Sequence, residues 1–249
     1  GYIYTSTDSG GTWTTQTASG ARYWYGIASS ADGVKLAAAA FTYGGYISTS
    51  VNSGVAWSTN SNSSGSRAWN SIASSADGVK LAAVVGNGYI YTSTDSGVTW
   101  GTQSDSSGSR DWRSITSSSD GTKLAAVAYG GYIYTSTDSG ASWTQETSAG
   151  SRNWQSISSA SDGGKIAAAV DSGYIYTFTP DTTAPTITNV SSDKTNGTYT
   201  VGEVIDIDVT FSEAVTSTGN VTVTLETGAT DRTCTFTVTS ASTGTCNYT

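Results

Sequence analysis

Short runs of alternating apolar and polar residues, separated by glycine turns, fill most of the first 179 residues. Residues 67–102 show the pattern: four short runs carry the apolar side chains, and Ala-Asp-Gly, Gly-Asn-Gly and Asp-Ser-Gly stand between them. Asp-Gly favours tight turns because glycine accepts positive φ and the Asp side chain accepts hydrogen bonds from nearby amides. No segment keeps an apolar period of 3.6 residues, which excludes a helical array. The pattern predicts an all-β chain with four short strands per block.

The same block returns along the chain. The sequence Gly-Tyr-Ile-Tyr-Thr-Ser-Thr-Asp-Ser-Gly begins at residue 1, and variants of it follow at intervals of 44, 43, 43 and 42 residues. Four strands in about 43 residues is the span of a β-propeller blade, whose apolar faces are buried only against neighbouring blades. We expect three complete four-stranded blades from about residue 22 to residue 145, with partial blades at both ends; a closed four-bladed ring and an open arc are both compatible with the sequence. The third strand of each block is expected at about Tyr2, Tyr46, Tyr89, Tyr132 and Tyr174.

One motif within the block carries a family resemblance. Residues 6–13, 93–100 and 136–143 fit Ser-x-Asp-x-Gly-x-Thr/Ser-Trp, and this motif resembles the Asp-box, or BNR, repeat of sialidase-like β-propellers. The second copy, residues 50–57, has Asn52 in place of Asp, which keeps the side-chain acceptor and removes the charge. A turn that accepts this change is expected to cap its own backbone and not to hold a metal ion or donate a proton. The structural positions are therefore Asp8, Asn52, Asp95 and Asp138, with Trp13, Trp57, Trp100 and Trp143.

A second repeated pattern lies in the connections between blades. An Arg stands two residues before a Trp in four successive blocks, at the end of the blade opposite to the Asp motifs if the strands form meanders. An Arg and an aromatic residue in each blade could form a ligand-facing ring that favours acidic glycans, but packing between blades is the interpretation that the repetition favours. Both interpretations stay open for Arg22, Arg67, Arg110 and Arg152 and for Trp24, Trp69, Trp112 and Trp154.

The repeat ends near residue 179, and a linker with the only two prolines is expected over 180–185. Residues 186–249 alternate Thr, Val and Ile with a period of two, and they resemble a truncated bacterial Ig-like domain. Cys234 and Cys246 would face each other across a hairpin near Ser240, which predicts a disulfide and an oxidising compartment. Two independent thiols are the alternative. Four acids could supply oxygen ligands to Ca²⁺, with solvated surface acids as the other interpretation: Glu203, Asp206, Asp208 and Glu213.

Composition narrows the function further. The net charge is −8 with scattered basic residues, which argues against a nucleic-acid partner, and no apolar run is long enough to span a bilayer. The chain has no His, so it lacks the usual Ser-His-Asp machinery. The sialidase resemblance implies an arginine triad, a Tyr/Glu nucleophile pair and an acidic proton shuttle; no position matches this set, although Glu146, Arg113, Asp105, Asp111 and Asp171 are singular charged residues.

The sequence thus predicts a fragment of an extracellular or cell-surface protein: a non-catalytic recognition or adhesion scaffold with a glycan or protein ligand at the propeller face. A fragment of a sialidase-like glycoside hydrolase, with its catalytic residues outside this chain, is the alternative. An intracellular or periplasmic assembly factor is a third class, which the Ig-like resemblance disfavours.

Overall fold

The chain forms two compact units, Gly1–Pro180 and Asp181–Thr249. The computed structural model describes residues 1–41, 45–59, 65–102, 108–178, 185–195, 203–215, 217, 219–225, 232–239 and 241–248. The division falls inside the predicted linker, of which residues 180–184 lie outside the described ranges. Each unit is considered by itself.

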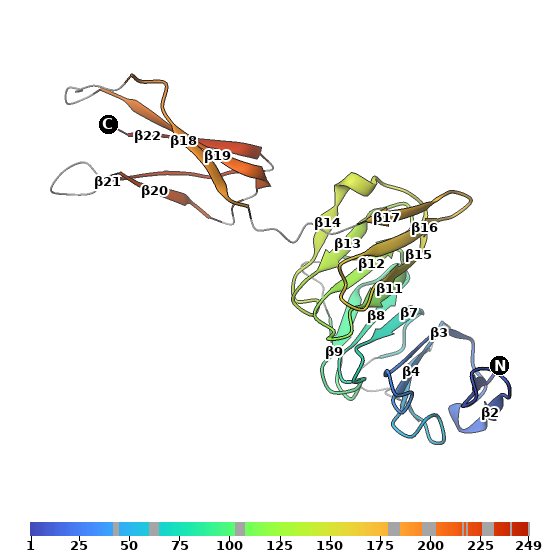
Figure 1. Ribbon diagram of the computed structural model, residues 1–249. Helices are drawn as coiled ribbons and strands as arrows, with labels where there is room; N and C mark the ends of the chain where they lie inside the picture. Colours follow the sequence, from blue (N-terminus) through green and yellow to red (C-terminus); the bar gives the residue numbers. More distant parts are fainter. Residues whose placement is uncertain are drawn as a thin grey trace. The chain divides into compact units, whose positions relative to one another are not determined.

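The first unit is an array of antiparallel sheets, coloured from blue to yellow in Figure 1. Three sheets have four strands in sequence order, and the blade prediction is confirmed to that extent. They comprise β3 (Trp24–Ser29), β4 (Leu36–Ala40), β5 (Ile47–Ser50) and β6 (Ser58–Thr59); β7 (Trp69–Ser74), β8 (Leu81–Val85), β9 (Ile90–Ser93) and β10 (Gly101–Thr102); and β11 (Trp112–Ser117), β12 (Leu124–Ala128), β13 (Ile133–Ser136) and β14 (Thr144–Glu146). A two-stranded sheet, β1 (Ile3–Thr5) and β2 (Thr14–Gln16), precedes them, and a three-stranded sheet, β15 (Trp154–Ser159), β16 (Ile166–Val170) and β17 (Ile175–Phe178), follows.

The core of this unit lies between the sheets. The second strand of each four-stranded sheet is buried along its whole length, because both of its faces meet a neighbouring sheet. Small side chains fill these strands, as in Leu-Ala-Ala-Val-Val of β8, and leave room for the fully buried Trp of the next inner strand. Each core cluster accordingly joins residues of two successive sheets; one contains Val84 and Ile90 of the second sheet with Trp112 and Ile115 of the third.

Successive sheets are also joined by hydrogen bonds. The turn after each inner strand donates a backbone amide to the next such turn, from Ala31 to Ala76, from Ala76 to Ser119 and from Ser119 to Ser161, with N–O distances of 2.7 Å each. The inner strands themselves meet through bonds such as Ile115 N to Ser71 Oγ at 3.3 Å. This ladder fixes the level at which each sheet sits against the next.

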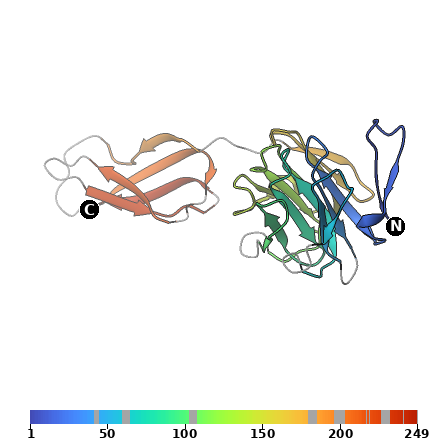
Figure 2. The same ribbon diagram turned by 90° about the horizontal axis from the view of Figure 1, so that it is seen from below.

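The array is open in this structure. The β1–β2 pair and the β15–β17 sheet lie at opposite ends of it, as Figure 1 shows. Among the described residues β2 pairs only with β1, and the outer edge of β17 pairs with no strand. Figure 2, turned by 90°, shows the sheets of the first unit side by side.

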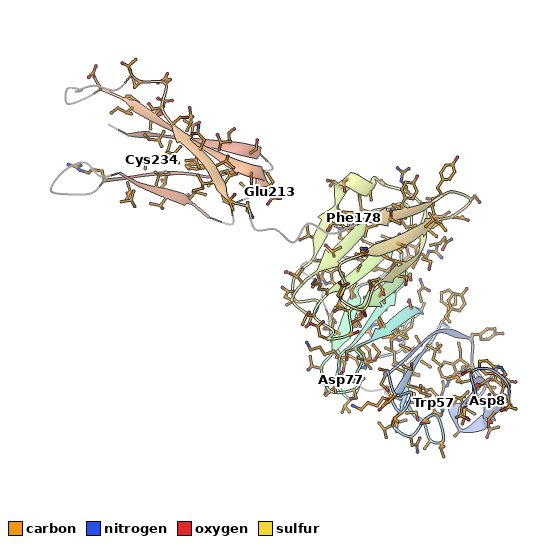
Figure 3. The ribbon with its side chains drawn as sticks, viewed as in Figure 1. Asp8, Trp57, Asp77, Phe178, Glu213 and Cys234 are labelled. Atoms are coloured by element: carbon orange, nitrogen blue, oxygen red, sulfur yellow. A yellow bond between two sulfur atoms is a disulfide. The ribbon has the colours of Figure 1, made fainter. Side chains whose placement is uncertain are left out.

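The second unit contains two sheets with one shared core. One sheet has the order β18 (Ile187–Ser191), β19 (Ile205–Val215) and β22 (Ala241–Tyr248), and the other pairs β20 (Val221–Leu225) with β21 (Arg232–Phe236). Cys234 of β21 and Cys246 of β22 form a disulfide with Cα atoms 5.7 Å apart (Figure 3). The predicted hairpin between these strands is wrong: β21 pairs with β20 and β22 with β19, so the disulfide joins the two sheets. Alternation shows which strand faces lie inward, but the choice of partner depends on the whole unit.

Candidate functional site

The Asp motifs form capped turns between the third and fourth strands of a sheet. The carboxylate of Asp95 accepts a bond from the Thr99 amide at 2.8 Å and one from the Thr99 hydroxyl at 2.6 Å, while Ser93 Oγ donates to it at 2.8 Å. Asp8 and Asp138 make the same set of bonds with their own neighbours. The backbone needs this help because the next residue, Ser96, has φ of 59°, in the left-handed region. The expected bonds to amides of the same turn are present.

The Asn copy behaves as the capping interpretation requires. Asn52 Oδ1 accepts from the Ala56 amide at 2.8 Å and from Ser50 Oγ at 3.0 Å, so the amide oxygen replaces the carboxylate. The indoles of the motif close two turns: Trp100 Nε1 donates to Gly97 O and Trp143 Nε1 to Gly140 O. Trp57 Nε1 is buried without a partner, and Trp13 is exposed. These residues build turns.

The arginine series lies on tyrosines of the third strand. The guanidinium carbons of three members stand 4.6 Å from the ring centroids of the Tyr in their own sheets, in the pairs Arg67–Tyr91, Arg110–Tyr134 and Arg152–Tyr176. Arg67 Nε also donates to Tyr91 Oη at 2.7 Å. Arg22 has no such Tyr, because Ser48 takes its place, and its guanidinium carbon lies 5.9 Å from the Trp24 ring. Cation–π stacking thus orients the series on its own sheets.

The tryptophans that follow these arginines are mostly inside. Trp69, Trp112 and Trp154 are fully buried and pack edge-on against Tyr91, Tyr134 and Tyr176. Their rings offer no face to a ligand in this arrangement, whereas Trp24 is half-buried. The arginines differ in exposure: Arg152 is exposed and the others are partly buried. Ligand binding by the series stays a prediction.

Each inner strand begins with a β-bulge. The register of the first two strands shifts between Trp24 and Gly26 in the first sheet, and the same shift recurs in the next three sheets. The extra residue of a bulge is released from regular pairing and its side chain is re-aimed, which is why bulges are common beside functional sites. The bulged residues are Tyr25, Asn70, Arg113 and Gln155.

These bulges coincide with variation in an otherwise repetitive sequence. Most of the flanking residues repeat, but these positions differ in all four sheets: the residue before the Trp, the bulged residue, and the residue that follows the second strand. The first and third of these are hydrogen-bonded to each other across the strands, as in Phe41 N to Tyr23 O at 3.0 Å. We call these positions the variable set: Tyr23, Tyr25 and Phe41; Ala68, Asn70 and Gly86; Asp111, Arg113 and Tyr129; and Asn153, Gln155 and Asp171.

The members of the variable set within one sheet contact each other. Tyr25 stacks on Phe41 with ring centroids 4.4 Å apart and an interplanar angle of 19°. In the third sheet, Arg113 lies 4.8 Å from the Tyr129 centroid and forms an ion pair with Asp111 at 2.7 Å. The first sheet therefore presents aromatic rings and the third a charged pair on an aromatic ring.

Two polar atoms of the variable set lack partners. Asn70 is buried and donates through Nδ2 to Trp112 O of the next sheet at 2.6 Å, but its Oδ1 has no hydrogen bond. Arg113 Nε is likewise buried and unsatisfied. Buried polar atoms without partners are uncommon in folded proteins, and both of these atoms lie below the accessible surface. Of the variable set, the sequence alone singled out only Arg113, Asp111 and Asp171. An alignment of the four repeats would have identified the other positions.

Two singular acids of the first unit are held by their neighbours. Glu146 accepts a bond from the Thr135 hydroxyl, and Asp111 is held by Arg113. Asp105 lies outside the described ranges.

The predicted Ca²⁺ ligands do not converge in the described part of the second unit, where no group of three or more His, Cys, Asp or Glu residues could hold a metal. Asp206 accepts bonds from Ser192 Oγ and Asp193 N. The hydrogen bond between the two carboxyl groups, and the repulsion of the Asp206 charge, raise the pKa of Asp193. Asp208 accepts from Thr245 Oγ1. Calcium binding at Glu203, Asp206, Asp208 and Glu213 stays a prediction.

Comparison with known proteins finds likeness in fold. No family model matches the chain, and no curated protein does. The GH74 xyloglucanase from Xanthomonas campestris superposes on 70% of this chain and 33% of its own, with a TM-score of 0.55 and 13% identity. YCF48 from Cyanidioschyzon merolae superposes on 74% of this chain and 65% of its own, with a TM-score of 0.54 and 15% identity. A chain in a nidogen/laminin complex covers 80% of this chain and 79% of its own, with a TM-score of 0.50 and 12% identity.

These likenesses establish a β-propeller fold for the array. This chain spans less than two thirds of the xyloglucanase and of YCF48. No helix in the described ranges is long and apolar enough to cross a membrane.

Proposed function

We propose that this chain is a non-catalytic recognition module of an extracellular or cell-surface protein, in which an Asp-box propeller array precedes an Ig-like domain. The ligand class is carbohydrate, and the variable set forms the contact surface. The observation that carries the proposal is the coincidence of bulge and variation: every blade re-aims one side chain at the same level, and that side chain differs in every blade.

The chemistry of the variable set suits a sugar. Tyr23, Tyr25 and Phe41 are 73%, 63% and 38% exposed, and aromatic rings of this kind pack against the C–H faces of pyranose rings. Asn153, Gln155 and Asp171 of the last sheet are exposed and provide hydrogen-bonding groups, whereas Asn70 Oδ1 and Arg113 Nε are buried. The arginines on their tyrosine rings lie beside the same loops, where they would favour glycans that carry carboxylates.

The direct test is a binding titration of the full chain with a neutral oligosaccharide, cellohexaose, and an acidic one, sialyllactose. Tyr25→Ala should weaken binding of the neutral sugar about tenfold, the loss of one stacked ring. Arg110→Ala should weaken only the acidic sugar. Trp13→Ala is the control, because Trp13 is an exposed aromatic residue in an Asp-motif turn.

Thermal unfolding of each variant separates loss of contact from loss of fold. Loss of binding at unchanged stability supports the proposal. If neither sugar binds to the wild type, the proposed ligand class is wrong.

The alternative, a fragment of a glycoside hydrolase, is supported by the GH74 xyloglucanase sharing the fold. It requires catalytic carboxylates outside this chain. Hydrolysis of an oligosaccharide by the chain itself would contradict the non-catalytic proposal.

A further inference from the structure

The two ends of the propeller array are the two halves of its own repeated interface. Between successive blades, an isoleucine of one third strand and an isoleucine of the next first strand share a core cluster. The buried pairs are Ile47 with Ile72, Ile90 with Ile115 and Ile133 with Ile157. Two members of this series are exposed, whereas the six paired residues are at most 6% exposed. Ile175 of the last sheet is 75% exposed. Ile27 of the first sheet is 55% exposed although Ile3 of β1 precedes it, because the β1–β2 sheet has only two strands and lacks the inner strands of a full blade.

The last sheet has a hollow at the position that the following blade fills in the interior of the array. It has a volume of about 440 Å³ and is lined by Lys165, Ile166 and Phe178 among others. The corresponding spaces inside the array measure about 10 Å³, because the next blade fills them. At one of these junctions the filling residues include Gly121, Leu124 and Ser139. In the first sheet, Gly33, Leu36 and Ser53 hold the same positions of the repeat.

The ladder of turn bonds stops at the same place. Each turn donates an amide to the next, and the series ends with Ser161 as an acceptor. In the described part of the chain the Ser161 amide makes no such bond onward, and Ala31 O, at the other end, receives none. A blade seated at the end would supply the missing acceptor.

Two strands of the array, one near each end, have the same sequence. Residues 1–5 and 173–177 are both Gly-Tyr-Ile-Tyr-Thr. In the first copy, Gly1 exchanges backbone bonds with Arg22, and Ile3, Tyr4 and Thr5 pair with Gln16, Thr15 and Thr14 of β2. Residues 173–177 have the same side chains, with a backbone amide at Gly173 where Gly1 has the terminal ammonium. Within the described residues, the outer edge of β17 pairs with no strand.

From these observations we propose that the array associates head to tail with a second copy of this chain. The β17 strand of one copy replaces β1 beside β2 of the other, and the first sheet of that copy enters the hollow. Exchange of identical segments makes swapping inexpensive, since residues 173–177 can remake the strand pairing that residues 3–5 make with β2.

The exchange should also lower the free energy. It exposes Ile3 and buries Ile175, which are equal side chains, so their burial cancels. The added terms are the burial of Ile27 by β15 and β16, the filling of the hollow, and the Ser161 amide bonded to Ala31 O. Lys165 can then donate to Ser53, as Lys80 does to Ser139 at 3.1 Å.

The second copy is favoured over closure within one chain because the array is open. The β1–β2 pair and the β17 edge stand at opposite ends in this structure (Figure 1), so β2 of the same chain does not meet β17. Head-to-tail contacts close when the rotation allows. Two copies would give about eight blades, within the range that propellers adopt.

The experiment is analytical ultracentrifugation of the full chain over a wide concentration range. We expect a species of twice the 25.5 kDa chain mass that grows with concentration. Ile27→Lys and Ile175→Lys each place a charge in the junction and should weaken association at least tenfold. Val98→Lys is the control, because Val98 is similarly exposed but lies in an interior turn. Circular dichroism and unfolding midpoints check that the variants fold.

Mixing gives the decisive outcome. Ile27→Lys spoils one end and Ile175→Lys the other, so an equimolar mixture retains one intact junction and should form dimers that neither variant forms alone. A mixture that stays monomeric overturns the head-to-tail proposal. A wild type that remains at the mass of one chain at every concentration also overturns the proposal. In such a monomer, protection of the β17 amides from hydrogen exchange would indicate closure within the chain.

Discussion

At the residue scale, the side chain of Asp or Asn in each capped turn binds amides that the left-handed serine beside it would leave unpaired. In the first turn, the Thr12 amide, the Thr12 hydroxyl and the Ser6 hydroxyl lower the pKa of Asp8 to about 2. For Asp95, burial raises the pKa, but the bonds from Thr99 and Ser93 outweigh it and the net shift is downward. The ionised carboxylate is therefore the form that the folded turn prefers.

We predict that Asp95→Ala lowers the free energy of unfolding by about 0.5–2 kcal/mol at pH 7, as the loss of a side-chain cap does. Because the folded pKa of Asp95 is below the unfolded value, its stabilising effect is complete above about pH 4 and declines as the pH falls through the folded pKa. Urea unfolding of wild type and variant at pH 7 and pH 2.5 should show the difference shrinking. A difference that grows at low pH would contradict the capping account.

Asn52 provides the control for that measurement. Its side chain makes the same amide bond without a titrating group, so Asn52→Ala should cost the same at both pH values. Equal pH dependence of the two variants would place the titration elsewhere in the array.

At the scale of the elements, the turn between the first two strands packs closely against the preceding blade. Gly121 has φ of 68°, and a Cβ there would lie 2.8 Å from the Lys80 side chain of the preceding blade. Gly33 has φ of 70° in the first blade, where a Cβ would meet nothing within 4 Å. A comparison of Gly33 with Gly121 therefore separates two effects of adding a Cβ: strain of the turn backbone and overpacking against the neighbouring blade.

We predict that Gly33→Ala costs about 1–2 kcal/mol, the penalty for a left-handed residue with a Cβ. Gly121→Ala should cost that amount plus about 1–3 kcal/mol for overpacking against Lys80. Urea unfolding at a concentration where the chain is monomeric measures both. Equal losses would show that the blades can separate locally without cost.

At the scale of the whole molecule, two units with different sources of stability share one chain. The array is stabilised by burial between sheets, where small residues of the second strands receive tryptophans. The second unit has one small core, and that core includes the two cysteines that join its sheets. Small units with limited cores depend more strongly on such cross-links.

We predict that replacing Cys234 and Cys246 together by serine lowers the stability of the second unit by about 2–4 kcal/mol and leaves the array unchanged. Tryptophan fluorescence reports the array alone, because every Trp lies in residues 13–154. Calorimetry should show one transition moving and the other fixed. If the fluorescence transition moves by the same amount, the two units unfold as one.

Repetition made the architecture predictable. The 43-residue period, the turn sequences and the alternation specify strand number, strand order and the capped turns, because these depend on contacts within a blade or with an equivalent neighbour. The capping role of Asp8, Asp95 and Asp138 follows in the same way, since all its partners lie within four residues.

Relations between non-equivalent or distant segments were decided only by the tertiary structure. The bulges re-aim Tyr25 and Arg113 through register with the second strand, which local sequence does not fix. Three of the four arginines selected by their spacing lie on tyrosines, and Trp69, Trp112 and Trp154 are buried, because side-chain exposure depends on how adjacent sheets pack. The pairing of β21 with β20, and the exposure of Ile27 and Ile175 at the two ends, are likewise properties of the assembled chain: each depends on contacts between residues far apart in sequence, or on their absence at the last member of a series.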